Sequence, residues 1–255
     1  SIEDGLIYEM SGYIRSGMYV GEKSGTDDHE AKSLYSEASL NLQVKKGTIG
    51  DAYFDLRFKE DLVESDANDH FNLRESYLNA YLGPVDLRLG QQIVVWGQAD
   101  GINPTNNITP INYKVFSPNE DDRREANYLI RSYLNSDLIR VEAIWIPKYE
   151  SSVLPLNEES LPDGVTLESM DNSDNGVHRG SGALKVYFQG NSLEASVSSF
   201  QGHHPTPGLT ATLNPDATFS VTTEPYEVRI FGTDFSTTIG KFGLRGEFSH
   251  WEILE

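Results

Sequence analysis

Hydrophobic residues recur at every second position along most of the chain. Between residues 6 and 20 the even positions are mostly apolar and the odd positions include charged residues, and the same alternation returns in 34–45 and 52–59. A period of two places the two sets on opposite faces of a β-strand, whereas a helix needs apolar residues three and four positions apart. No stretch of useful length has the helical spacing, so the chain is predicted to be all-β.

The alternation defines about eleven strands, most of them about 9–13 residues long, in an antiparallel meander. Short and long connections alternate between them. The short ones, at 46–48, 83–84, 135–137 and 190–191, have the Gly, Pro, Asn and Asp residues of tight turns. The long ones are predicted at 21–33, 97–125, 148–181 and 202–222, and they are rich in Asp, Asn, Gly, Pro and Thr.

Two architectures fit long amphipathic strands in a meander. In a soluble sandwich or lipocalin-like barrel the apolar faces form a dry core, and in a transmembrane β-barrel they face lipid while the polar faces line a wet lumen. Strand length favours the transmembrane barrel, because strands of soluble proteins typically have only about five or six residues. We therefore expect Leu40, Leu56, Leu87 and Val141 to face lipid.

Aromatic residues near the expected strand ends are typical of the girdles at the two membrane interfaces. The residues assigned to such a girdle are Tyr19, Tyr53, Tyr81, Trp96, Trp145, Tyr226 and Trp251. Eleven is an odd number, whereas bacterial single-chain barrels generally have an even number of strands. The sequence therefore predicts a single β-barrel domain over 1–255 with about 11–12 strands visible, as the N-terminal part of a larger barrel.

Composition excludes several classes of function. The chain of 255 residues carries 39 Asp and Glu against 20 Lys and Arg, a net charge of −19. This balance argues against nucleic-acid binding, which relies on clustered basic residues. Cysteine is absent, which excludes disulfides, Cys-ligated zinc and thiol catalysis. No apolar run is long enough for a transmembrane helix.

Candidate chemistry is sparse, and the chain is predicted not to be an enzyme and to need no cofactor or metal. His203 and His204 are expected to lie in a solvated loop, because adjacent side chains diverge and no second ligand pair is present. The segment 171–176 opens like a calcium loop but lacks the final Glu of an EF-hand. The acidic loop 148–181 is predicted to be solvated, with weak binding of divalent cations beside lipopolysaccharide as the alternative. Ser249 and His250 are adjacent and therefore face opposite sides of a strand, which argues against a nucleophile and base.

The charged residues on the polar faces are predicted to line a lumen, where opposite charges pair across strands and create a transverse field. The candidate basic residues are Arg57, Arg74, Arg88, Arg140, Arg229 and Arg245, and the acidic ones are Glu37, Asp55, Glu75, Asp86, Glu142 and Glu247. The loop at 97–125 either folds inward as a constriction or caps the strand ends. Asp100, Asn103 and Asn106 in this loop either face a permeating solute or stabilise turns.

Residues 71–125 carry the most distinctive motif of the chain. It contains Arg88-Leu89-Gly90-Gln91-Gln92, then Trp96-Gly97-Gln98-Ala99-Asp100, then Ile102-Asn103-Pro104. This resembles a family of porin-like outer-membrane β-barrels of Gram-negative bacteria, catalogued as a domain of unknown function, with R-x-G-x-Q, W-G-x-[AS]-D and I-N-P segments. The chain departs from the family in having Asn106 where an Asp is usual, and Ile111-Asn112 where an Arg-Asp pair is usual.

The resemblance implies a location in the outer membrane and a porin-like role without catalysis. The expected partners are outer-membrane lipid and lipopolysaccharide, a small solute and, as one option, further copies of the chain in a homo-oligomer. The chain is thus predicted to pass or bind a small solute, with a soluble lipocalin- or lectin-like binding module as the alternative. Neither the solute nor the sign of the ion selectivity follows from the sequence.

Overall fold

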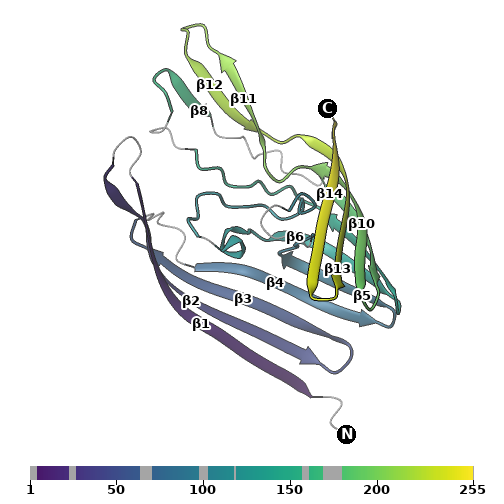
Figure 1. Cartoon of the computed structure of the whole chain (residues 1–255). Helices are drawn as coiled ribbons and strands as arrows, with labels where there is room; N and C mark the ends of the chain where they lie inside the picture. The colour runs from purple at the N-terminus through teal and green to yellow at the C-terminus, as the bar shows by residue number, and fades with distance from the viewer. Residues whose placement is uncertain are drawn as a thin grey trace.

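The computed structural model describes residues 5–22, 27–63, 71–97, 103–117, 119–156, 161–168 and 180–254. Eleven strands form one large sheet (Figure 1). In chain order they are β1 (Leu6–Glu22), β2 (His29–Lys46), β3 (Gly50–Asp61), β4 (Phe71–Leu82), β5 (Val85–Gln92), β6 (Asn127–Asn135), β7 (Ile139–Ile146), β9 (Ser181–Gln189), β10 (Leu193–His203), β13 (Glu227–Ile239) and β14 (Phe242–Leu254). Every neighbouring pair in this sheet is antiparallel.

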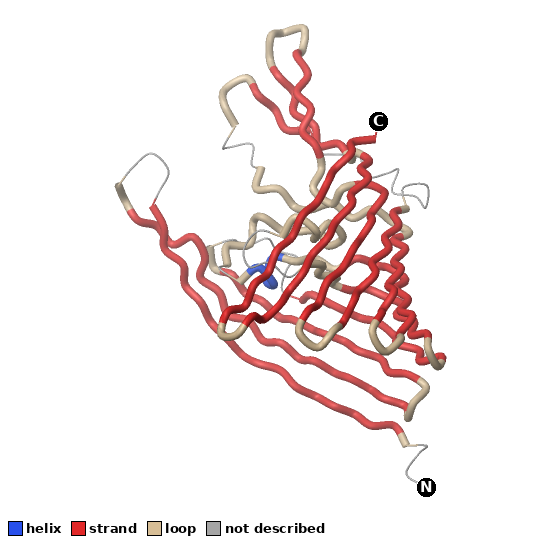
Figure 2. The backbone as a smooth tube through the Cα atoms, turned by 45° about the vertical axis from the view of Figure 1, so that its right-hand side comes forward, coloured by secondary structure: helices blue, strands red, loops and turns tan. Residues whose placement is uncertain are grey.

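The eleven strands lie side by side in chain order, from β1 at one edge of the sheet to β14 at the other. They curve into a wall around a central space (Figures 1 and 2). The predicted all-β meander and its eleven main strands are confirmed. β1 and β2 are longer than expected, with 17 and 18 residues, because their pairing continues to Glu22 and His29.

Three short strands, which the sequence analysis did not predict, lie in the long connections. They are β8 (Val165–Glu168), β11 (Gly208–Leu213) and β12 (Phe219–Glu224), and they form a separate small sheet. The helical content of the described residues is one 3-10 turn, η1 (Glu120–Arg123). No helix in this part of the chain is long and apolar enough to cross a membrane.

Short and long connections emerge at opposite ends of the wall (Figure 2). The short turns join β2 to β3, β4 to β5, β6 to β7, β9 to β10 and β13 to β14. At the β4–β5 turn, Gly83 has a φ of 74°, a conformation that strongly favours glycine. The connection between β5 and β6 leaves the opposite end and turns back into the space that the wall surrounds (Figure 1). We call residues 93–126 the inward loop.

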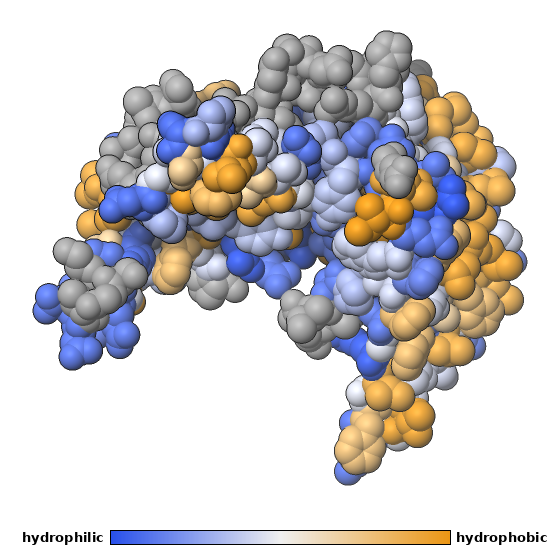
Figure 3. Space-filling view, turned by 90° about the horizontal axis from the view of Figure 1, so that it is seen from above, coloured by the Kyte–Doolittle hydropathy of each residue, from blue (hydrophilic) through white to orange (hydrophobic). Residues whose placement is uncertain are grey.

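Apolar side chains cover much of the outer side of the wall in Figure 3, and the inner side is mostly polar away from the long-loop end. Leu40 pairs with Leu56 across β2 and β3, and Val141 pairs with Leu134 and Val186. Leu87 lies on the same face of β5 as the exposed Leu89. None of the four residues predicted to face lipid belongs to the buried apolar cluster. Many large apolar side chains on the wall are exposed, as is typical of a contact with membrane or protein.

The girdle predicted from aromatic residues is wrong for most of its members. Trp145 faces outward and is half-exposed. Tyr81 instead donates a hydrogen bond to Asp51 on the inner face, and Trp96 is buried. Tyr53 stacks on Tyr77 beside inner-face residues. The remaining three, Tyr19, Tyr226 and Trp251, also stack with residues of the inner side.

Near the long-loop end of β13, apolar side chains point inward and polar ones outward, which is the reverse of the prediction. Val228 and Ile230 point inward and are buried, which places Arg229 on the outer face. There Arg229 forms an ion pair of 3.5 Å with Glu252 on β14. The prediction that Arg229 lines the lumen is therefore wrong. The physical reason is that inward-facing positions at this end of the wall are apolar, because they pack against the inward loop.

We predict that Leu40→Arg destabilises the barrel, whereas Asn41→Arg, one residue further along β2, is tolerated. Leu40 is 40% exposed on the outer face near the middle of its pairing with β3. Arginine at such a position costs about 2–4 kcal/mol in a bilayer. Asn41 faces the polar inner side, opposite Asp55. Chemical unfolding in lipid vesicles measures both variants, and equal losses of stability would refute this orientation of the wall.

Candidate functional site

The inward loop docks on an apolar patch of the inner wall. Val94, Trp96 and Ile108 of the loop are fully buried or nearly so. The wall residues of this buried cluster are Leu129, Ile144, Ile146, Ala183, Phe200, Val228 and Ile230, from β6, β7, β9, β10 and β13. Burial of such side chains contributes about 1.5–3 kcal/mol each. The loop is therefore held inside the wall by a small hydrophobic core of its own.

Specific hydrogen bonds fix the path of the loop. The Thr109 hydroxyl accepts a hydrogen bond of 2.8 Å from the Val94 backbone nitrogen and donates one of 2.7 Å to the Val94 carbonyl oxygen. The Thr105 hydroxyl donates to Glu247 on β14 at 2.9 Å. Gly97 has a φ of 93°, and a Cβ there would lie within 2.7 Å of the Glu247 carboxylate. The positive φ strongly favours glycine at this position, where the loop approaches Glu247 of β14.

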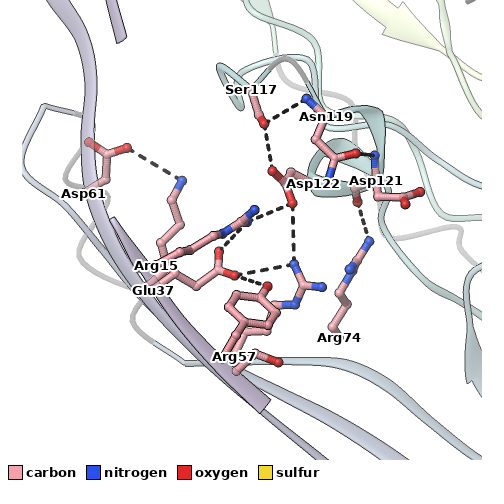
Figure 4. Close-up of polar contacts among 12 residues, drawn as sticks. Arg15, Glu37, Arg57, Asp61, Arg74, Ser117, Asn119, Asp121 and Asp122 are labelled. Atoms are coloured by element: carbon pink, nitrogen blue, oxygen red, sulfur yellow. Dashed lines mark hydrogen bonds and ion pairs between the residues drawn. The ribbon is translucent and has the colours of Figure 1, made fainter. Parts of the chain in front are cut away.

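The tip of the loop carries η1 and meets an arginine cluster on β1 and β3 (Figure 4). The Arg15 guanidinium donates to Glu37 at 3.0 Å and to Asp122 of η1 at 2.8 Å. Arg57 lies 3.7 Å from Glu37 and 3.8 Å from Asp122. Asp122 also accepts a hydrogen bond of 2.7 Å from Ser117. Two arginines of the wall thus share one carboxylate from the wall and one from the loop.

A β-bulge brings Arg74 into the same cluster. Asp55 of β3 pairs with Glu75 of β4, but the next residue, Leu56, pairs with Leu73, so Arg74 is an extra residue in β4. A bulge of this kind re-aims the side chain of the extra residue. Arg74 reaches the loop and donates a hydrogen bond to the Asp121 carbonyl oxygen (Figure 4). Arg74 and Glu75 can therefore both face inward although they are adjacent.

Between the arginine cluster and the loop lies a recess of about 180 Å³, which we call the charged recess. Its lining contains five basic side chains, Arg15, Arg57, Lys59, Arg74 and Arg124, and three acidic ones, Glu37, Asp122 and Glu125. Basic side chains outnumber acidic ones in this lining, although the chain as a whole is strongly negative. A charged group near this recess experiences the local field rather than the average charge of the chain.

Along the rest of the inner wall, asparagines bridge arginines and aspartates through hydrogen bonds. Arg88 on β5 donates to Asn79 at 2.8 Å, and Asn79 donates to Asp51 at 2.9 Å. Nearer the short turns, Asn135 donates to Asp86 at 2.8 Å and accepts from Arg140 at 2.9 Å.

Glu142 on β7 is fully buried and forms an ion pair with Arg131. Beside it, Lys185 and Asp234 form a buried ion pair of 2.8 Å, with Lys185 5.5 Å from the ring of Trp96. Removal of one partner of such a pair typically costs about 3–5 kcal/mol.

The structure places the predicted lumen residues Arg57, Arg74, Glu75, Asp86, Arg88, Arg140 and Glu142 on the inner side of the wall. Glu75 accepts a hydrogen bond from the Ile93 backbone and so supports the start of the inward loop. Asn103 and Asn106 line a different recess, described below. Asp100 and the calcium-like segment 171–176 lie outside the described residues.

Sequence reasoning missed Arg15 and Asp122, which hold the centre of the cluster. Arg15 occupies a polar-face position of β1, and Asp122 belongs to the charged run at 120–124, so both had a signal in the sequence. The prediction of a solvated loop at His203 and His204 is wrong. His204 is half-buried, stacks on Tyr226 and contacts the tilted ring of Trp251. In the described part of the chain, no group of three or more His, Asp or Glu residues is placed to hold a metal ion.

Asp122 is held in its charged form. Burial acts to raise the pKa of Asp122, but hydrogen bonds from Arg15 and Ser117 and the charges of Arg15 and Arg57 outweigh it and lower the pKa below its ordinary value of 3.8. The loop tip is therefore fastened to the wall by an anion that stays ionised at neutral pH.

Comparison with solved structures identifies the fold. OmpT of Vibrio cholerae, an outer-membrane protein solved in a trimer form, aligns with a TM-score of 0.54 and 13% identity over 98% of this chain and 67% of its own. A second OmpT structure aligns with a TM-score of 0.51 and 13% identity over 99% and 66%. The chain has the fold of a porin-like outer-membrane β-barrel. This porin-like barrel spans about two thirds of the length of the OmpT structures it matches.

Other comparisons add little to this assignment. OmpF of Salmonella typhi, in complex with daunomycin, aligns with the porin-like barrel at a TM-score of 0.41 and 13% identity, over 98% of this chain and 79% of its own. No protein-family model and no curated protein matches the chain. The motif-based resemblance to one particular porin-like family therefore stays a prediction.

We predict that Asp122→Asn loosens the inward loop of the porin-like barrel. The substitution keeps the shape of the side chain but removes the charge that Arg15 and Arg57 share, and we expect a loss of about 1–3 kcal/mol of stability. Asp137→Asn, in the exposed turn between β6 and β7, is the matched control. Thermal unfolding in detergent micelles measures both, and an unchanged midpoint for Asp122→Asn would contradict the role of this carboxylate.

A pH dependence follows from the lowered pKa of Asp122. The fold stabilises the ionised carboxylate of Asp122. Its contribution to the free energy of unfolding is therefore fully present above the ordinary pKa of 3.8 and is lost as the pH falls through the lower pKa of the folded state. The stability difference between the wild type and Asp122→Asn should therefore be constant near neutral pH and shrink below pH 3.8. Unfolding of both proteins between neutral and acidic pH tests this, and a constant difference throughout would contradict it.

Proposed function

We propose that this chain forms a channel wall in the outer membrane of a Gram-negative bacterium, as a single barrel domain through which small polar solutes pass. The observation that carries the proposal is the inward loop, which crosses the lumen from an apolar patch on one side to the arginine cluster on the other. A wall that is apolar outside and charged inside, narrowed by an ordered loop, supports passage of solutes better than storage of a ligand in a dry core.

The charged recess supports a preference for small anions. Five basic side chains face three acidic ones there. Arg74 differs from its neighbours, because within the described residues no carboxylate lies at ion-pair distance from it and it donates a hydrogen bond to the Asp121 carbonyl oxygen. An arginine that no carboxylate contacts directly is a site at which a passing anion can be stabilised.

The outer surface supports the other partners in this proposal. Exposed apolar side chains such as Ile14 and Val197 are suited to contact with lipid or with a second copy of the chain. Lipopolysaccharide would surround the long-loop end. We propose no catalytic activity, since Ser249 faces the lumen and its neighbour His250 faces outward, as their pairing with Gly232 and Phe231 requires.

We predict that the full-length protein conducts ions in planar bilayers with a preference for anions over cations. Arg74→Glu should lower the anion-to-cation permeability ratio by about threefold or more, because the substitution reverses a charge beside the route of the ion. Lys241→Glu, in the exposed turn between β13 and β14, makes the same change of charge away from the recess.

Reversal potentials in a potassium chloride gradient measure the ratio for the wild type and both variants. A conducting wild type that prefers cations, or equal shifts in the two variants, would refute the proposed role of the recess. A wild type that inserts into bilayers without conductance would refute the channel itself.

A further inference from the structure

A second recess lies on the other side of η1, between the inward loop, β14 and the segment that follows β10. It has a volume of about 330 Å³, within the lower range of small-molecule sites. Its lining includes Asn106, Asn107, Tyr113, Arg123, His204 and Trp251. We call it the aromatic recess. We propose that it is a binding subsite for a neutral polyhydroxylated solute, that is, a small carbohydrate.

An oriented aromatic ring forms one side of the aromatic recess. Trp251 points inward from β14 and is 41% exposed. Its indole nitrogen donates to the Ser249 hydroxyl at 2.8 Å, and its ring centroid lies 5.0 Å from that of His204. His204 in turn stacks on Tyr226 at 5.6 Å. The ring of Trp251 is thus held in place from behind, and such preorganisation lowers the entropic cost of binding.

The stack stays uncharged at neutral pH. Burial lowers the pKa of His204, although a hydrogen bond with the Thr206 backbone acts in the opposite direction. A neutral imidazole behind Trp251 leaves the exposed ring as an apolar surface. The C–H groups on one face of a sugar ring form an apolar surface of matching size, which can pack on an aromatic face.

Two asparagines of the inward loop line the same recess and offer both hydrogen-bond donors and acceptors. Asn106 accepts a bond of 3.4 Å from the Trp96 backbone through its carbonyl oxygen, and Asn107 donates a bond of 3.1 Å to Pro104 through its amide nitrogen. These bonds orient the two side-chain amides. They leave the amide nitrogen of Asn106 and the amide oxygen of Asn107 for a ligand. Each sugar hydroxyl both donates and accepts, and therefore matches such a mixed set.

The charges of the aromatic recess are compensated within η1 and its flank. Glu120 lies 4.0 Å from Arg123 and 3.5 Å from Arg124, and Arg124 also pairs with Asp121. The lining of the aromatic recess has Arg123 and Arg124 against Glu120, so its positive excess is smaller than that of the charged recess. An ion would gain little from these paired charges, and an apolar ligand would leave the amides unpaired, so a neutral polar solute fits best.

This inference rests on the proposed channel, and the test separates the two. Sucrose, raffinose and maltotriose are added to the full-length protein in planar bilayers. We expect at least one of them to reduce the current in a concentration-dependent way. Trp251→Ala should raise the half-blocking concentration about tenfold. Trp145→Ala, which removes an indole from the outer face, is the matched control and should leave that concentration unchanged.

Intrinsic fluorescence in detergent micelles gives a second measurement. It does not depend on conductance, and it does not require that Trp251→Ala folds. The same sugars should change the emission of the wild type but not that of Trp251→Phe, which keeps Trp96 and Trp145. A conducting wild type with no block and no fluorescence change would overturn this inference alone. Sugar-dependent fluorescence without conductance would support it and overturn the channel. A Trp251-dependent block by citrate but not by the sugars would overturn the assignment to a neutral ligand.

Discussion

The inward loop depends on a change in the chemistry of the inner wall from one end to the other. Near the short turns the inner face is polar and hydrated, as at Asp86 and Arg140. Near the long connections it becomes apolar, through residues such as Ile144, Phe200 and Val228. A long polar loop would otherwise remain in solvent, because fixing its backbone costs about 1–2 kcal/mol per residue in conformational entropy. Burial of Val94, Trp96 and Ile108 on this patch offsets that cost locally and determines where the loop enters the lumen.

Once the loop is docked, electrostatics places its tip. Arg15 and Arg57 lie close together on the wall and would repel each other without nearby carboxylates. Glu37 supplies one from the wall, and Asp122 supplies the other from the loop. The pairing is specific because Arg15 contacts both carboxylates with one guanidinium nitrogen, at 3.0 and 2.8 Å. The apolar patch thus provides most of the binding energy of the loop, and the charge cluster determines its position.

The sequence predicts the wall well and the interior poorly, for physical reasons. A period of two is strong wherever one face meets lipid and the other meets water, so the eleven main strands and most of their faces are predicted correctly. The period weakens where both faces are apolar, as in Ile144-Trp145-Ile146. Arg229 was assigned to the lumen for the same reason, because apolar residues occupy the inward-facing positions of β13 beside it. Such doubly apolar strand ends are the signal that a loop packs inside.

Interior partners are harder to predict, because they join residues far apart in the chain. Arg15 and Asp122 are separated by more than a hundred positions, and no local pattern links them. Arg74 and Glu75 were both assigned to the lumen, which strict alternation forbids for neighbours. The bulge in β4 permits it, but a bulge without glycine leaves no mark in the sequence. The aromatic residues were misplaced because a ring near a strand end can face a membrane interface or a lumen.

A single turn of the loop serves both recesses, and the distribution of its charges explains how they differ. Asp122 is turned toward Arg15, whereas Glu120 and Asp121 pair with the arginines that follow them. Arg124 lines both recesses. On the side of β1 to β4 the arginines outnumber the carboxylates, and on the side of β14 the charges of the turn compensate one another. A displacement of η1 would therefore alter both environments together, which makes the docking of the loop the feature on which any selectivity of this wall depends.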